Sequence, residues 1–299
     1  MIISIKNPYF KPGKVNSNMT HIIDGRAMAD ELLAEIANKI KNYQLLPRLQ
    51  IVMVGDNLAS TIYTKNKLNA ARRVGMEAEL LALDANTTTQ ELLAHIDGFN
   101  ADRCVHGIIV QLPLPSHIDT STIIERIAPH KDVDCFHPVN LGRLFLGRST
   151  LFKPCTPSGC IHILARSGVE VAGKHVVIVG RSNIVGKPLG LMLTNLDATV
   201  TLCHSRTHDL PNLMRLGDIV VCAVGKAHLF DVGYFKTGAV VIDVGISKVD
   251  GMLCGDVNAG SVLSAVGMLT PVPGGVGPMT VAYLIKNTLD AAIAAWNDH

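Results

Sequence analysis

The stretch HVVIVGRSNIVGKPLGLML, residues 175–193, contains a strand-length apolar run, a turn with two glycines and a second apolar segment that suits a helix. A strand buried on both faces reads as such a continuous apolar run. Glycines in the turn let backbone N–H groups and the positive end of the helix approach a diphosphate. Because Gly180 and Gly186 are spaced as G-x-S-x-x-x-G rather than G-x-G-x-x-G, the interpretation also relies on the flanking strand and helix. The stretch predicts a dinucleotide-binding βαβ unit.

Three further apolar segments predict more strands of the same sheet; they are residues 198–207, 217–225 and 238–247. The first ends in Ser205 and Arg206, where NAD-binding sites usually carry an acidic residue that accepts hydrogen bonds from the ribose. Together with Arg181, these residues offer donors and positive charge that suit the additional phosphate of NADP. An Arg206 that is simply solvated is the alternative. The cofactor is predicted to be NADP, held by Gly180, Arg181, Ser182, Ile184, Val185, Gly186, Ser205, Arg206 and Ile246.

Segments before residue 170 also alternate between helical and strand patterns. The predicted helices are residues 24–43, 58–74, 86–100 with a threonine N-cap, and one that Pro129 stops; the predicted strands are residues 47–56 and 105–115. A polar loop with Asp132, Asp134 and His137 then leads to a turn and helix at residues 153–168. Helices that alternate with strands predict an α/β fold with crossover helices.

The alternation starts afresh near residue 171, which predicts two α/β domains with a cleft between them, the second a Rossmann-like, doubly wound parallel sheet. The final segment, a Pro/Gly loop and a helix, is expected to return to the first domain. The predicted boundaries are residues 19–156 plus 276–299 for the first domain and 157–275 for the second. Residues 1–18 are expected to form a poorly ordered extension.

Composition narrows the class of protein. With 299 residues, 48% of them hydrophobic, the chain can form two domain cores. A formal net charge of +2 and the lack of a long basic run argue against a nucleic-acid partner. The longest apolar runs are of strand length, short of the ~20 residues needed to cross a bilayer. No membrane contact is expected, and the absence of a signal-peptide pattern predicts a cytoplasmic protein.

Seven scattered cysteines without a C-x-x-C pair argue against a disulfide framework and a zinc site. His204 and His208 have the spacing of metal-binding helices, but they fall in a strand that runs into a loop. No metal is predicted.

The segment ASTIYTKNK, residues 59–67, places Tyr63 and Lys67 on one face of a predicted helix. Short-chain dehydrogenases use a Tyr-x-x-x-Lys pair for proton transfer, but there the pair follows the dinucleotide turn, whereas here it precedes it by over a hundred residues. An amphipathic helix with a half-buried tyrosine and a snorkelling lysine is the other interpretation.

The chain resembles the bifunctional methylenetetrahydrofolate dehydrogenase/cyclohydrolase family from about residue 22 to residue 292. Eight strings match in the family's order: VGDNLASTIYTKNK, GIIVQLPLP, KDVDCFHPVNLGRL, PCTPSG, VIVGRSNIVGKPL, VIDVGIS, GDVN and TPVPGGVGPMT. The resemblance implies that the first domain binds folate and the second binds NADP, and that the protein pairs as a homodimer.

By this resemblance, the catalytic residues are Lys67, Tyr63, Gln111 and Asp134. The implied substrate-binding residues are Tyr63, Lys67, Gln111, Leu112, Pro113, Asp134, Pro273, Gly274 and Gly275. Asp134 can accept the paired N–H donors of a pterin, although a loop-capping role is the alternative. A lysine that moves protons near neutral pH needs a pKa well below ~10.4, and an uncharged partner such as Gln111 preserves that shift. Tyr63 can stack on the ring.

The implied reaction is NADP-dependent oxidation of 5,10-methylenetetrahydrofolate to the 5,10-methenyl form, followed by hydrolysis to 10-formyltetrahydrofolate. A dehydrogenase without cyclohydrolase activity and a non-catalytic folate-binding protein are the alternatives. The sequence departs from the family at Leu58 (commonly Pro), Cys135 (commonly Gly) and Val139 (commonly Tyr). Cys135 is the departure expected to affect a site loop.

Overall fold

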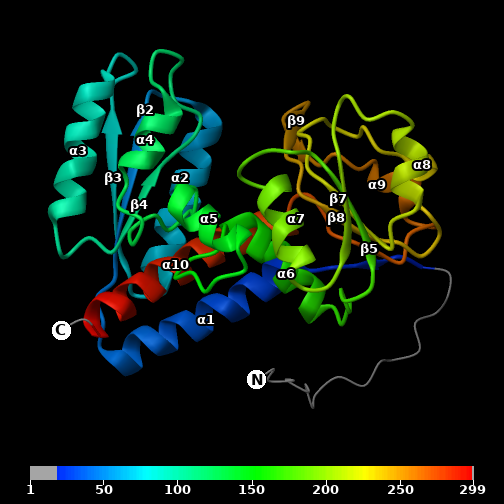
Figure 1. Cartoon of the computed structure of the whole chain (residues 1–299), viewed down its shortest axis with the longest axis horizontal. Helices are drawn as coiled ribbons and strands as arrows, with labels where there is room; N and C mark the ends of the chain where they lie inside the picture. The colour runs from blue at the N-terminus through cyan, green and yellow to red at the C-terminus, as the bar shows by residue number, and fades with distance from the viewer. Residues whose placement is uncertain (1–18, 298–299) are drawn as a thin grey trace.

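The computed structural model describes residues 19–297, so the extension predicted for residues 1–18 lies outside the described residues. Figure 1 shows two lobes, each a sheet with helices, above two long helices that run across the bottom of the view. These helices are α1 (Gly25–Tyr43) and α10 (Val276–Asn297). The two-domain α/β architecture predicted from the sequence is confirmed.

The first domain is built on a three-stranded parallel sheet in the order β3-β2-β4. Its strands are β2 (Arg48–Val54), β3 (Glu77–Leu83) and β4 (Gly107–Val110), and its helices are α2 (Leu58–Arg73), α3 (Thr89–Ala101) and α4 (Thr120–Arg126). The predicted threonine N-cap is Thr88, which forms a capping box with Glu91. Strand β3 was not predicted; it is an edge strand in which Leu80 is 39% exposed, and it therefore lacks a clear apolar pattern.

The second domain is a six-stranded parallel sheet in the order β1-β11-β8-β7-β5-β6. Its strands are β1 (His21–Ile22), β5 (His175–Val179), β6 (Thr199–Cys203), β7 (Ile219–Cys222), β8 (Val240–Asp243) and β11 (Met268–Leu269). The remaining elements are α7 (Gly186–Thr194), α8 (Leu210–Arg215), η1 (Val232–Tyr234), α9 (Ala259–Val262) and a hairpin of β9 (Ser247–Val249) and β10 (Met252–Cys254). The chain goes from β5 to β6 on one side and then to β7 on the other, so the strand order reverses at β5. Such a reversal opens a crevice at the carboxyl ends of the strands, where ligands bind in this class of fold.

Strand β1 lies in the second domain, although the sequence predicted that residues 19–156 belong to the first. His21 and Ile22 pair with Met268 and Leu269 of β11, in the sheet of the second domain. The Thr20 hydroxyl also donates hydrogen bonds to the carbonyls of Leu263 and Val266. These partners are over 240 residues away in sequence, so no local pattern could indicate the pairing.

Helices join the two domains. Helix α10 packs against α1, α2 and α6 (Cys155–Arg166), which confirms that the final helix returns to the first domain. Gly25, the first residue of α1, lies against Gly275, which directly precedes α10, so that a Cβ on Gly25 would collide with the Gly275 carbonyl. Helix α5 (Pro138–Phe145), which was not predicted, begins with a proline after the N-cap His137. Within the described part of the chain, no helix has the length and apolar character needed to cross a membrane.

Candidate active site

The glycine turn after β5 is confirmed as a strand-to-helix connection. Gly180 has φ +127°, and a Cβ on it would collide with the carbonyl of Ala223. A Cβ on Gly186 would collide with the carbonyl of Gly180. Both glycines are thus needed for the close approach of the turn, β7 and α7. The Ser182 hydroxyl accepts a hydrogen bond from the Val185 N–H over 3.1 Å and shapes the turn.

The other predicted cofactor residues lie at the same edge of the sheet. Ser205 and Arg206 follow β6, which pairs with β5 in parallel, so they share an edge with exposed Arg181. The Arg206 N–H donates to Nδ1 of His204 over 3.1 Å, and this bond fixes the backbone beneath the exposed guanidinium. The structure therefore places the two arginines and the turn at one exposed edge of the sheet.

A cavity of about 430 Å³ lies between the two domains and contains most of the predicted substrate site. The predicted residues that line it are Tyr63, Lys67, Gln111, Leu112, Pro113, Asp134, Ile184, Val185 and Ile246. The first six come from the first domain and the last three from the second domain. A ligand in this cleft would therefore contact both domains at once.

Lys67 and Gln111 form the central polar contact of the cleft. Lys67 on α2 is 9% exposed, and its Nζ donates to Oε1 of Gln111 over 3.0 Å. Gln111 directly follows β4 and is itself oriented, because its Nε2 donates to the Leu112 carbonyl over 2.8 Å. Tyr63 lies one turn before Lys67 on α2, and burial raises the pKa of its phenol. The lysine thus has a fixed, uncharged partner at the wall of the cleft.

The aspartates of the loop after α4 have separate roles. Asp132 is 2% exposed, and its carboxylate accepts hydrogen bonds from the N–H groups of Phe136 and His137 and from the Asn140 amide. Desolvation by burial raises the pKa of Asp132 to about 6. Asp134 lines the cleft instead. Asp132 therefore shapes the loop, whereas the Asp134 carboxylate is available to a ligand.

Cys135 occupies a backbone position that favours glycine. Its φ is +61°, in the left-handed region, and its side chain is buried with Sγ 3.6 Å from the Phe152 carbonyl. Of the other departures, Val139 is 47% exposed on α5, and the Leu58 side chain lies outside the described residues. Cys135 thus combines backbone strain with side-chain packing beside Asp134.

The loop with Pro273, Gly274 and Gly275 is the part of the predicted substrate site that the cavity does not include. Gly274 has φ +107°, and Gly275 is buried against Pro271 and the start of α1. Pro273 is exposed, and Val276 and Gly277, which directly follow the loop, line the cavity. The lining residues without a predicted role are Asn57, Ser60, Val110, Phe136, Cys155, Thr156, Val244, Val276, Gly277, Thr280 and Val281. Most of them lie within or beside the eight strings that match the family. Their position in these strings was therefore the sequence signal that could have identified them as lining residues.

Two buried aspartates without a predicted role hold the loops at the dinucleotide end of the cleft. Asp243, at the end of β8, accepts hydrogen bonds from the N–H groups of Gly245, Asp256 and Val257. Burial raises the pKa of Asp243 to about 7. Asp256 accepts from the N–H groups of three consecutive residues, 224–226, after β7. The two carboxylates thus connect the loops after β7, β8 and β10.

Comparison with known proteins agrees with this geometry. Two family models match: the catalytic domain of tetrahydrofolate dehydrogenase/cyclohydrolase over residues 23–134, and its NAD(P)-binding domain over residues 154–296. The bifunctional protein FolD of Halalkalibacterium halodurans is 50% identical over 91% of this chain and 98% of its own length. That of Magnetococcus marinus is 51% identical over 93% and 99%.

Solved structures have the same fold. The FolD structure from Campylobacter jejuni has a TM-score of 0.90 at 42% identity and covers 92% of this chain and 99% of its own. The Trypanosoma brucei enzyme, solved with NADP and an inhibitor, has a TM-score of 0.89 at 39% identity over 93% and 99%. The chain described here belongs to the tetrahydrofolate dehydrogenase/cyclohydrolase family.

Proposed function

We propose that the protein oxidises 5,10-methylenetetrahydrofolate with NADP and hydrolyses the methenyl product to 10-formyltetrahydrofolate in one cleft. The observation that carries this proposal is the Lys67–Gln111 contact in a cavity that Ile184, Val185 and Ile246 of the dinucleotide-binding domain also line. A group able to move a proton and a hydride acceptor would therefore meet at the same folate carbon.

For the oxidation, the chain mainly has to align its ligands. The turn at residues 180–186 and the N-terminus of α7 would hold the diphosphate, and Arg206 with Arg181 would hold the additional phosphate. Bound NADP supplies the hydride acceptor. Asp134 would accept the N–H donors of the pterin, and Tyr63 would stack on the ring, so that the methylene carbon points across the cleft.

For the hydrolysis, Lys67 is the group that would hold or move a proton of the attacking water. The side chain is buried at 9% exposure, and among the described residues Nζ donates one hydrogen bond, to the uncharged Gln111. The lysine would thus present its remaining protons at the wall of the cleft, where water would reach the methenyl carbon.

Absorbance of the purified protein with methylenetetrahydrofolate and NADP tests the proposal. We expect methenyl to form and then to decay faster than in buffer. Methenyl that forms but decays at the buffer rate would identify a dehydrogenase without cyclohydrolase activity. Folate binding without methenyl formation would identify a non-catalytic binding protein. Either outcome would contradict the proposed pair of activities.

We also propose that the protein is a cytoplasmic homodimer. All seven cysteines are free thiols, which suits a reducing compartment. The β9–β10 hairpin exposes Met252 (72%) and Leu253 (48%), which offers an apolar surface to a second copy. Sedimentation of the full chain tests the pairing, and a monomer at micromolar concentration would contradict it.

A further inference from the structure

A second cavity, of about 520 Å³, is separate from the cleft. Its lining comes from α5, the loop after it, α6, α7 and α10, and shares no residue with the cleft. Helices α6 and α10 separate the two cavities and are joined on the cleft side by a 3.0 Å hydrogen bond between Thr156 and Thr280. The volume is within the range of small-molecule sites.

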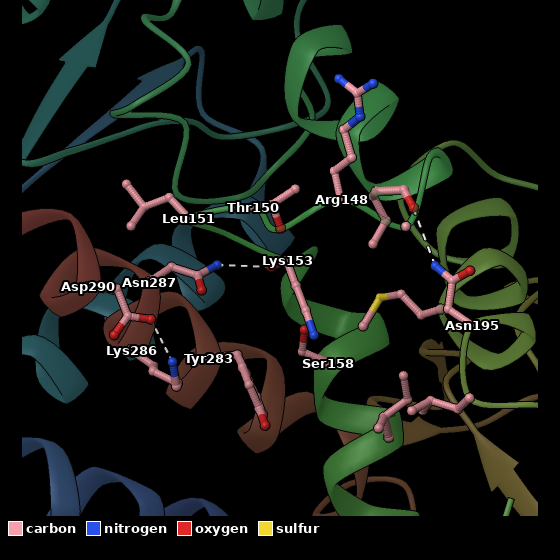
Figure 2. A pocket seen from close by; sticks show the side chains of 15 residues that line it. Arg148, Thr150, Leu151, Lys153, Ser158, Asn195, Tyr283, Lys286, Asn287 and Asp290 are labelled. Atoms are coloured by element: carbon pink, nitrogen blue, oxygen red, sulfur yellow. Dashed lines mark hydrogen bonds and ion pairs between the residues drawn. The ribbon is translucent and has the colours of Figure 1, made fainter. Parts of the chain in front are cut away.

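The charged groups of this cavity are mainly cationic. Arg148, Lys153 and Lys286 line it together with one carboxylate, Asp290. Lys286 pairs with Asp290 over 2.5 Å, whereas Arg148 and Lys153 have no ion pair with any described residue. In Figure 2 the Lys153 side chain runs toward α6, while the Arg148 guanidinium points away from the other lining side chains. Lys153 is therefore the cation best placed to meet a ligand.

A buried hydroxyl without a partner lies beside Lys153. Ser158 on α6 is 4% exposed, and its Oγ has no hydrogen bond to any described residue. Figure 2 shows its side chain pointing from α6 into the space that Lys153 and Tyr283 border. Buried polar atoms normally have a partner, so the lone hydroxyl indicates a missing acceptor or donor. Thr150, also in the lining, has a second unpartnered hydroxyl.

The rest of the lining is mostly apolar, with the amides of Asn195 and Asn287 beside it. The apolar part consists of Leu144, Leu151, Ile161, Met192, Leu196 and the ring of Tyr283. We propose that this cavity is a second ligand site, which binds a small organic anion with an apolar body. The anionic group would meet Lys153 and the Ser158 hydroxyl, and the body would lie against the aliphatic side chains. The site is independent of the proposed folate chemistry.

The test uses 8-anilinonaphthalene-1-sulfonate, an apolar anion that fluoresces when shielded from water, with the full chain at saturating NADP. We expect one equivalent to bind, and Lys153→Gln to weaken binding about fivefold, as for one partly exposed charge contact. Arg148→Gln should weaken it less, because its guanidinium points away, and Lys153→Arg should retain binding. Lys39→Gln, an exposed lysine of α1, is the matched control and should bind as the unaltered protein does.

Uncharged N-phenyl-1-naphthylamine, which lacks the sulfonate, separates charge from apolar contact. We expect Lys153→Gln to leave its binding unchanged. Sulfonate binding that is equal in Lys153→Gln and the unaltered protein would overturn the proposal. So would sulfonate that binds without NADP but fails to bind at saturating NADP, which would place the probe in the dinucleotide site.

Discussion

The loop after α4 contains one buried aspartate and one that lines the cleft, whereas the two aspartates that hold the loops after β7, β8 and β10 are both buried. Asp132, Asp243 and Asp256 are buried, and each accepts three hydrogen bonds, all but one of them from backbone N–H groups. Asp134, two residues after Asp132, accepts no hydrogen bond from any described residue and lines the cleft. A carboxylate surrounded by backbone donors shapes a loop, whereas one left open beside a cavity can bind a ligand.

Asp243→Ala should give the largest loss of stability. It leaves three buried N–H groups without an acceptor, so we expect the free energy of unfolding to fall by about 4 kcal/mol. Urea denaturation measures this. Asp231→Ala, which removes one exposed bond to the Gly233 N–H, is the control and should cost less than about 1 kcal/mol. Equal losses would contradict the loop-holding role.

Asp134→Asn should separate binding from stability. Losing the charge-assisted contact to the pterin should lower kcat/KM for the folate about 100-fold, with thermal stability unchanged. Asp132→Asn should lower stability and leave kcat/KM nearly unchanged, because the residue does not line the cleft. Its three hydrogen-bond donors lose a carboxylate, so we expect the free energy of unfolding to fall by about 2 kcal/mol. Equal changes of kcat/KM and of stability in the two variants would contradict the separate roles of Asp132 and Asp134.

Arg206→Gln tests the dinucleotide edge. Loss of one charge contact to the additional phosphate should raise KM for NADP about tenfold and leave KM for NAD unchanged. Steady-state kinetics with both cofactors provide the measurement, and Arg103→Gln, an exposed arginine of the first domain, is the control. An equal change for both cofactors would show that Arg206 does not select NADP.

Substitutions of Cys135 should change stability less, and the smaller side chain should give the more stable variant. Cys135→Gly removes more atoms than Cys135→Ala, but alanine keeps the left-handed strain and glycine relieves it. We therefore expect the glycine variant to be about 1 kcal/mol more stable than the alanine variant in thermal denaturation. A more stable alanine variant would mean that the strain at this φ is negligible.

The sequence predicted the elements whose pattern is local. The turn at Gly180 and Gly186 has flanking segments with clear strand and helix periods, and the Tyr63–Lys67 pair lies on a regular helix. The pairing of β1 with β11 and the contact of α6 with α10 depend on residues far apart in the chain. Two-residue strands carry too little pattern to be recognised alone.

The site was predicted in part for a similar reason. Motif strings pointed to Lys67, Gln111 and Asp134, which line one cavity. They did not distinguish residues 273–275, which the cavity does not include, from Val276, Gly277 and Thr280, which line it. Which residues of a string line the cavity depends on how the loop packs on α1. A short glycine-rich segment has no sequence pattern that indicates this packing.

The central claim, that Lys67 serves the hydrolysis in a cleft shared with the oxidation, is tested most directly by Lys67→Met. We expect methenyl hydrolysis to fall at least ~100-fold, as for loss of a general acid or base, and methenyl formation to fall less. Lys65→Met, an exposed lysine two residues away on α2, is the matched control and should retain both rates. Methenyl hydrolysis by Lys67→Met at the rate of the unaltered protein would contradict the account.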